Sequence, residues 1–157
     1  MSTTRLTDAI TALLAAYNAA AGLAGVPVYD GAAPSGAADT DFVIVGHDGT
    51  IAADGTLEAT ALAGTYAQQW ADTTAGQDER GSVNCLVVSQ AGDVGDVAGR
   101  RARVKVLLAA AEDAAAAAVV SHLTLDGTTD GRFIYRQSAG GVVVMCAYRV
   151  SYSAPWN

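Results

Sequence analysis

The stretch that most constrains the fold spans residues 78–120, DERGSVNCLVVSQAGDVGDVAGRRARVKVLLAAAEDAAAAAVV. Residues 82–90 place apolar side chains on both faces of an extended chain, which predicts a buried strand. A turn rich in Asp and Gly follows. A long helix is expected to begin near Asp93 or Asp96, because an aspartate can cap a helix and suits its positive end. A strand that leads through a short turn into a long helix indicates a sheet with helices packed against it.

The predicted long helix has an apolar stripe and a basic start. Its apolar residues recur at steps of three, four and seven: Val97, Val104, Leu108, Ala111, Ala115 and Ala118. Its first turns carry four of the nine basic residues of the chain, Arg100, Arg101, Arg103 and Lys105. One interpretation is a solvated helix face. The other is a contact with another subunit, since a guanidinium pairs bidentately with a carboxylate. The sequence leaves both open.

The rest of the chain predicts one more helix and five more strands. The helix is expected over 4–21, and the strands over 26–30, 41–47, 65–71, 132–138 and 142–153. Loop composition marks 31–40, 48–64, 72–81 and 121–131, of which 48–64 is expected to be a long exposed loop or arm. Gly140 and Gly141 suit the tight turn of a closing hairpin.

This order of elements, without linker or repeat, predicts a single domain over residues 1–157. The predicted class is α+β, with a mixed, mainly antiparallel sheet packed against two main helices and a C-terminal β-hairpin. In the last strand, Val142, Val144, Cys146, Tyr148, Val150 and Tyr152 are expected on one face. Only the other face becomes polar toward the end of the strand.

Charge and composition limit the function classes. The net charge of −7 and the pI near 4.5 argue against an ordinary nucleic-acid-binding module, which needs basic surface to neutralise phosphates. Aromatic residues make up only 6% of the chain, so a core of Ala and Val is expected to be thin and to be completed by a neighbouring subunit. No apolar run approaches the roughly 20 residues of a membrane span.

The cysteines and the N-terminal residues indicate folding in a cytoplasm. Cys85 and Cys146 both fall in apolar strand patterns, which is typical of buried free thiols in a reducing compartment. A cross-strand disulfide is the alternative if the two strands are neighbours. The N-terminal residues lack the unbroken apolar core of a signal peptide.

No pattern predicts catalysis, a metal or a cofactor. His47 and His122 have no Cys or His at metal-ligand spacing, and Ser82 and Ser89 lack the nucleophile elbow of a hydrolase. The Asp-rich turns at 48–55 and 126–131 do not meet the EF-hand pattern and are read as ordinary turns; no phosphate-binding glycine motif follows a strand. We expect the chain to be neither an enzyme nor a cofactor protein.

Assembly contacts are the remaining candidates. The basic helix start would face acidic loops of another subunit, with Asp48 and Asp54 as candidate partners, in a head-to-tail ring. Trp156 follows Pro155 and is a candidate interface anchor. Four further aromatic residues, Tyr66, Trp70, Tyr148 and Tyr152, are expected to pack in the core and at strand edges rather than form a ligand box.

Five segments carry a resemblance to a known family. They are GLAGVPVYDG (22–31) after the first helix, DFVIVGHDG (41–49), TYAQQWADTTAGQDERGSVNCLVVSQAGD (65–93), the RRAR helix, and GGVVVMCAYRVSYSA (140–154). Together they make the chain resemble a tail terminator protein of long-tailed (siphovirus-type) bacteriophages that infect actinobacteria. The resemblance covers nearly the whole chain and is weakest in residues 48–64 and 121–130.

The resemblance implies a virion structural protein assembled in the host cytoplasm. Such a subunit forms a homohexameric ring on the head-proximal end of the tail, stops polymerisation of the tail tube protein and meets the head-completion or connector protein. Phage DNA passes through the lumen without specific binding, and an acidic lumen would let it slide. No membrane and no cofactor are implied. The alternatives are another head–tail joining or minor tail protein, or a non-catalytic small-ligand-binding α+β domain that uses Trp70 and the tyrosines.

Overall fold

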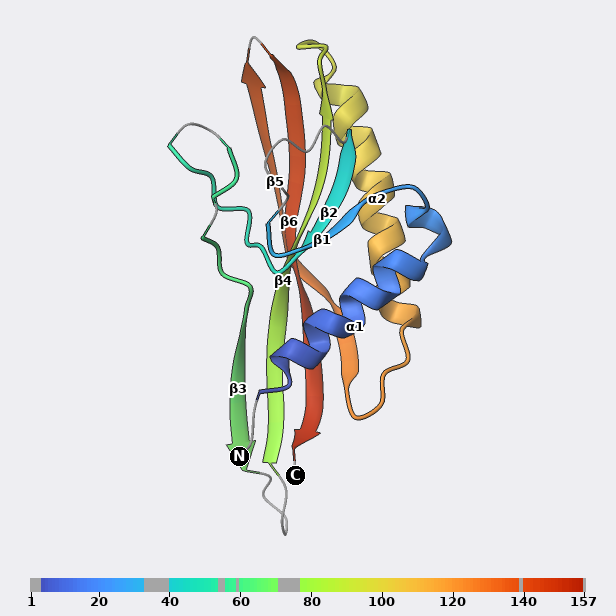
Figure 1. Cartoon of the computed structure of the whole chain (residues 1–157), viewed down its shortest axis with the longest axis vertical. Helices are drawn as coiled ribbons and strands as arrows, with labels where there is room; N and C mark the ends of the chain where they lie inside the picture. The colour runs from blue at the N-terminus through green and yellow to red at the C-terminus, as the bar shows by residue number, and fades with distance from the viewer. Residues whose placement is uncertain are drawn as a thin grey trace.

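The computed structural model describes residues 4–32, 40–53, 56–58, 60–70, 77–138 and 140–156. A twisted sheet carries both helices on one face (Figure 1). The elements are α1 (Leu6–Ala19), the short 3₁₀ helix η1 (Ala21–Leu23), β1 (Val28–Asp30), β2 (Asp41–Val45), β3 (Gly64–Trp70), β4 (Gln77–Ala91), α2 (Val97–Ala117), β5 (Thr124–Ser138) and β6 (Gly141–Trp156). The predicted α+β class, with its closing β5–β6 hairpin, is confirmed.

The sheet is split along its length because two strands share one edge of β4. The order is β1-β2-β4-β6-β5, and β3 also pairs with β4. Strand β2 pairs with residues 85–89 of β4, and β3 pairs with residues 77–83. We call the part built around β2 (28–30, 41–45, 85–91, 132–138 and 141–148) the β2 half. The part built around β3 (64–70, 77–83, 124–129 and 149–156) is the β3 half. All pairings are antiparallel except β1 with β2.

Two apolar clusters hold the sheet from its two faces. Under the helices, the predicted face of β6 is buried as expected: Val142, Val144, Cys146, Tyr148, Val150 and Tyr152. On the opposite face of the β2 half, a second cluster gathers Phe42, Ile44, Leu86, Val88, Met145 and Ala147. Ile51 and Leu57, which face each other in an isolated bridge, pack against this cluster. The segment expected to be an exposed loop or arm therefore contributes apolar cover through these two residues.

Two predicted loops are wrong in part. Residues 77–81, expected to be a turn, begin β4, and residues 124–131, expected to be a connector, begin β5. In both segments even the positions on the helix side carry polar residues or glycine, such as Glu79, Gly81 and Thr128, so the apolar alternation that marks a strand is missing. In β5 the register also shifts between Leu125 and Gly127 and between Thr129 and Arg132. Such bulges further break the period of two.

The apolar stripe of α2 differs from the predicted one by one position. The buried residues are Val104, Leu107, Ala111 and Ala115, whereas Leu108 is half-buried. Both leucines fit a helical period around Val104, so spacing alone did not separate them. Leu107 therefore replaces Leu108 as the large core side chain of this helix.

Candidate assembly surfaces

The four basic residues at the start of α2 form two pairs, of which Arg100 and Arg103 make contacts within the subunit. Arg103 donates from Nε to Asp41 Oδ2 at 2.8 Å, and Arg100 donates from Nε to Asp96 Oδ2 at 3.2 Å. Arg100 also donates to Ser89 Oγ, which in turn donates to Asp41. Asp96 is the N-cap residue of the helix, as expected, but its side chain makes no capping hydrogen bond. The fold thus uses Arg100 and Arg103 to fasten α2 to β2 within the subunit.

Of the four basic residues at the start of α2, Arg101 and Lys105 stay on the surface. Both are exposed, and neither makes a hydrogen bond or ion pair among the residues that the structure describes. Of the four predicted interface cations, these two can meet a partner without first breaking a contact within the subunit.

The other predicted interface residues are only partly placed. The Asp48 carboxylate accepts hydrogen bonds from the amide and hydroxyl of Thr50. Burial raises the pKa of Asp48, but these bonds and one from the Leu62 amide outweigh it, so the pKa is lowered. Asp54 lies outside the described residues. Trp156 ends β6 opposite Gln77, and its side chain is also outside them.

A buried carboxylate that the sequence analysis missed ties α1 to the β3 half. Glu79 is fully buried, and its Oε1 accepts hydrogen bonds from the Arg5 amide (2.7 Å), the Thr4 hydroxyl (2.8 Å) and the Tyr152 hydroxyl (2.8 Å). Its Oε2 accepts one from Gln68 Nε2 (2.9 Å). Burial raises the pKa of Glu79, yet the four donors stabilise the charge and the pKa is lowered overall.

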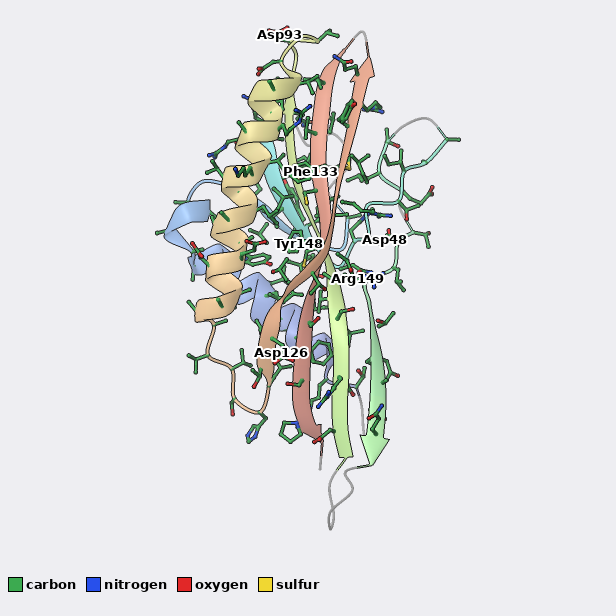
Figure 2. The ribbon with its side chains drawn as sticks, turned by 180° about the vertical axis from the view of Figure 1, so that it is seen from behind. Asp48, Asp93, Asp126, Phe133, Tyr148 and Arg149 are labelled. Carbon is green, nitrogen blue, oxygen red and sulfur yellow. The ribbon has the colours of Figure 1, made fainter. Side chains whose placement is uncertain are left out.

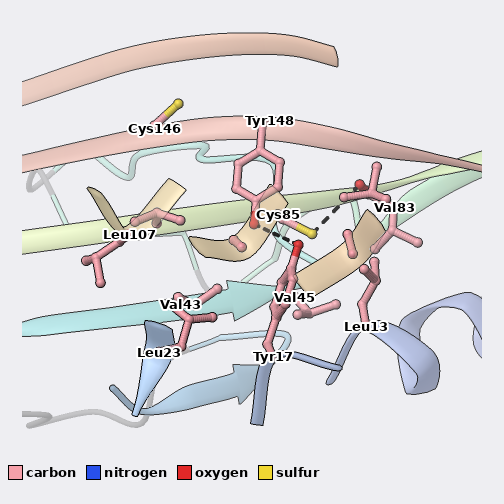
Figure 3. Close-up of a cluster of buried hydrophobic side chains, with 14 of the residues drawn as sticks. Leu13, Tyr17, Leu23, Val43, Val45, Val83, Cys85, Leu107, Cys146 and Tyr148 are labelled. Atoms are coloured by element: carbon pink, nitrogen blue, oxygen red, sulfur yellow. Dashed lines mark hydrogen bonds between the residues drawn. The ribbon is translucent and has the colours of Figure 1, made fainter. Parts of the chain in front are cut away.

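A second buried polar group lies in the centre of the core. The hydroxyls of Tyr17 and Tyr148 are 2.9 Å apart, and the neighbouring Cys85 thiol donates to the Val83 carbonyl oxygen at 3.9 Å (Figure 3). Burial raises the pKa of both tyrosines and raises that of Cys85 to about 12. Cys85 and Cys146 are both free and buried. Tyr148 and Tyr152 belong to the core, which removes them from any ligand box.

The β3 half has an uncovered polar face. Strand alternation places Thr65, Ala67, Gln69, Asp78, Arg80, Ser82, Arg149, Ser151 and Ser153 on the face opposite the helices. At its border with the β2 half, Asp48, Asp130, Arg132 and Arg149 line a hollow of about 370 Å³. Asp48 and Arg149 project on this side in Figure 2. The face carries both signs of charge and no apolar patch.

Both outer strands of the β3 half have one free edge among the described residues. Strand β3 pairs only with β4, and β5 pairs only with β6. Each intervening pairing is antiparallel, so β3 and β5 run in opposite directions. A free edge presents unpaired N–H and C=O groups that another strand can complete. These edges are the clearest sites at which the sheet can be extended.

Two of the residues considered as catalytic candidates, His47 and Ser89, make structural contacts. The buried His47 ring accepts a hydrogen bond from the Gly49 amide at Nδ1, and its Nε2 lies 3.0 Å from the Glu58 carbonyl oxygen. Ser89 links Arg100 to Asp41, as described above. Among the described residues, no three His, Cys, Asp or Glu side chains are grouped as metal ligands. In that same part of the chain, neither helix has the length and apolarity needed to cross a bilayer.

Comparison with known proteins gives structural likeness but no sequence match. No protein-family profile matches the chain, and no curated protein sequence matches it. A chain from the virion of a native gene transfer agent particle is similar in structure, with a TM-score of 0.48. The two chains are 22% identical, and the match covers 92% of each. A likeness this weak carries no assignment of function.

Proposed function

We propose that this chain is a phage virion structural protein of the tail terminator type. It would form a ring on the head-proximal end of the tail tube, end tube polymerisation and join the tail to the head. The sequence resemblance supports this role. The observation that carries it is the pair of free, oppositely directed edges of the β3 half.

The free edges suit a closed ring of identical subunits. If β3 of one copy lies beside β5 of the next, the new pair is antiparallel, as are all the pairings between β3 and β5 within the subunit. Two different patches of one subunit then meet, which is the head-to-tail contact that generates rings. The homohexamer, the tail tube partner and the connector partner follow from the resemblance. The acidic lumen stays a prediction.

No catalytic step is needed for this role, and we infer that the chain is not an enzyme. Another head–tail joining or minor tail protein is the alternative of the same class. Binding to purified tail tubes separates the two, because a terminator caps one end of the tube and prevents further growth. Negative-stain images of tubes with the protein would show this cap.

Cross-linking tests the ring contact itself. Introduced cysteines at Thr65 of β3 and Thr129 of β5, which lie on the same face of the sheet, joined by a flexible bismaleimide, should give a ladder of covalent oligomers that ends at one closed size on tail tubes. The native Cys85 and Cys146 are buried and should not react in the folded chain. Each single-cysteine variant is the matched control and should give no ladder. A double variant that caps tubes but yields only monomer would contradict the β3–β5 contact.

A further inference from the structure

Two aromatic side chains form an exposed row along the part of β5 that leads into the β5–β6 turn. Phe133 exposes 50% of its surface and Tyr135 exposes 60%. They pair with Cys146 and Val144, so they point to the helix side of the sheet. Gln137 continues this face and donates a hydrogen bond to the carbonyl of Val94, which is also exposed. Neighbouring exposed aromatic residues of this kind mark an interaction surface.

The two unpaired cations of α2 border this row. Arg103 reaches β2 on one flank of the helix, so the 100° step per residue turns Arg101 and Lys105 to the other flank, toward β5. Arg100 bonds Ser89, which lies in register with Val144 and Tyr135. Arg101 therefore lies at the height of Tyr135, and Lys105, one turn later, lies near the height of Phe133. Figure 2 shows Phe133 on the side of β5 that faces α2.

The same stretch of β5 lies at an edge of the sheet. Among the described residues, β5 is the last strand of the sheet on this side. In an antiparallel strand, alternate residues direct their N–H and C=O groups away from the paired neighbour. A segment added here would gain main-chain hydrogen bonds with β5. Its side chains on the helix side of the sheet would lie beside the aromatic row and near the two cations.

We propose that residues 132–138 of β5, together with Arg101 and Lys105, form a docking edge for an extended segment of a partner protein that alternates acidic and aliphatic residues. The charge complementarity selects an acidic segment, because both cations are exposed and unpaired in the described chain. Two cations on a chain of net charge −7 are too few for a nucleic acid. The site belongs to the β2 half and does not depend on the ring contact proposed for the β3 half.

Peptide binding to the full chain tests the proposal. The probe is a short fluorescein-labelled peptide of alternating Glu and Val, followed by fluorescence anisotropy at physiological salt. The double variants Phe133→Ser/Tyr135→Ser and Arg101→Glu/Lys105→Glu should each weaken its binding about tenfold or more. N-methylation of alternate peptide amides should also weaken binding, because it removes the main-chain hydrogen bonds.

Matched controls sit elsewhere on the same sheet. Tyr66 is an aromatic residue of β3 with 51% exposure, and Arg80 is an exposed cation of β4. Tyr66→Ser and Arg80→Glu should leave the affinity unchanged. Circular dichroism checks that every variant is folded, and the single variant Tyr135→Ser replaces the double one if that variant unfolds.

Several outcomes would overturn the docking edge. One is no measurable binding of the Glu–Val peptide, and another is equal affinity for all variants. A peptide of alternating Lys and Val that binds as tightly would remove the charge argument. An oligothymidine that competes at this patch would point to nucleic acid. Concentration-dependent self-association that Phe133→Ser abolishes would assign the surface to a second copy. Because the peptide assay uses the chain without tail tubes, its failure is distinct from a failure of ring formation.

Discussion

The two halves of the sheet share three strands but differ in how they are stabilised. In the β2 half, helices bury one face of β2, β4 and β6, and Ile51 and Leu57 pack on the other, so both faces are apolar. In the β3 half, α1 covers one face through the bonds to Glu79, and the other face is polar and uncovered. The difference shows that the degree of burial changes along β4, β5 and β6, so each of these strands has a more buried segment and a less buried one. The β2 half forms the body, and the β3 half extends from it with edges that a neighbour can use.

The largest effect is expected in the body, at Leu107. Leu107→Ala should lower the free energy of unfolding by about 2–5 kcal/mol, because it opens a cavity in a core that the small Ala residues of α2 cannot refill. Denaturant unfolding followed by circular dichroism measures this. Leu108→Ala is the matched control and should cost clearly less, since Leu108 is half-buried. Equal losses at the two positions would contradict the position of the α2 stripe.

The second effect concerns the link between α1 and the β3 half. Glu79→Gln should destabilise the fold by about 1–3 kcal/mol, because an amide cannot accept all four hydrogen bonds that the carboxylate accepts. Hydrogen exchange should show the loss first in α1 and β3. If α1 kept its protection in this variant, Glu79 would not be the link that holds it.

The same carboxylate predicts a pH dependence. The pKa of Glu79 is lowered in the folded chain, so its stabilisation is present above the ordinary glutamate value of 4.5 and is lost as the pH falls through the lowered value. Wild-type stability should therefore fall over this acidic range more steeply than that of Glu79→Gln. Parallel curves for the two proteins would mean that other carboxylates account for the acid sensitivity.

A smaller effect is expected at Gly81 of β4, where neighbouring strands approach closely. Gly81 lies between Tyr66 of β3 and Tyr152 of β6 in register, and a Cβ atom there would lie 2.7 Å from the Tyr152 ring and would also meet the Thr65 carbonyl oxygen. Gly81→Ala should cost about 1–2 kcal/mol through this overpacking. Gly92→Ala, where no atom is near, is the control and should be close to neutral. If Gly81→Ala left the free energy of unfolding unchanged, the β3 half would adjust to an added methyl group more easily than the β2 half.

The structure of the β2 half was predicted better from the sequence than that of the β3 half. The strands over 41–45 and 85–91 and the alternation of β6 were predicted because apolar residues there report burial directly. The starts of β4 and β5 were missed because polar residues or glycine occupy even their helix-side positions, so no apolar residues mark them. Glu79 was missed for a related reason: in sequence it is one charge in a polar run. Its donors come from Thr4, Gln68 and Tyr152, which only the fold brings together.

The smallest effect on stability is expected among the cations of α2, where the paired Arg103 should contribute more than the unpaired Arg101. Spacing placed all four on one helix start, but Asp41, which pairs with Arg103, lies far earlier in the chain, so only the fold distinguishes them. The Arg103 side chain is 39% exposed and that of Asp41 17%, so solvent screens the pair in part. Arg103→Met should therefore cost at most about 1 kcal/mol in unfolding free energy, and Arg101→Met should cost about nothing. A double-mutant cycle with Asp41→Asn measures the coupling. If Arg101 coupled to Asp41 as strongly as Arg103 does, Arg101 would belong to the body and would no longer be available to a partner.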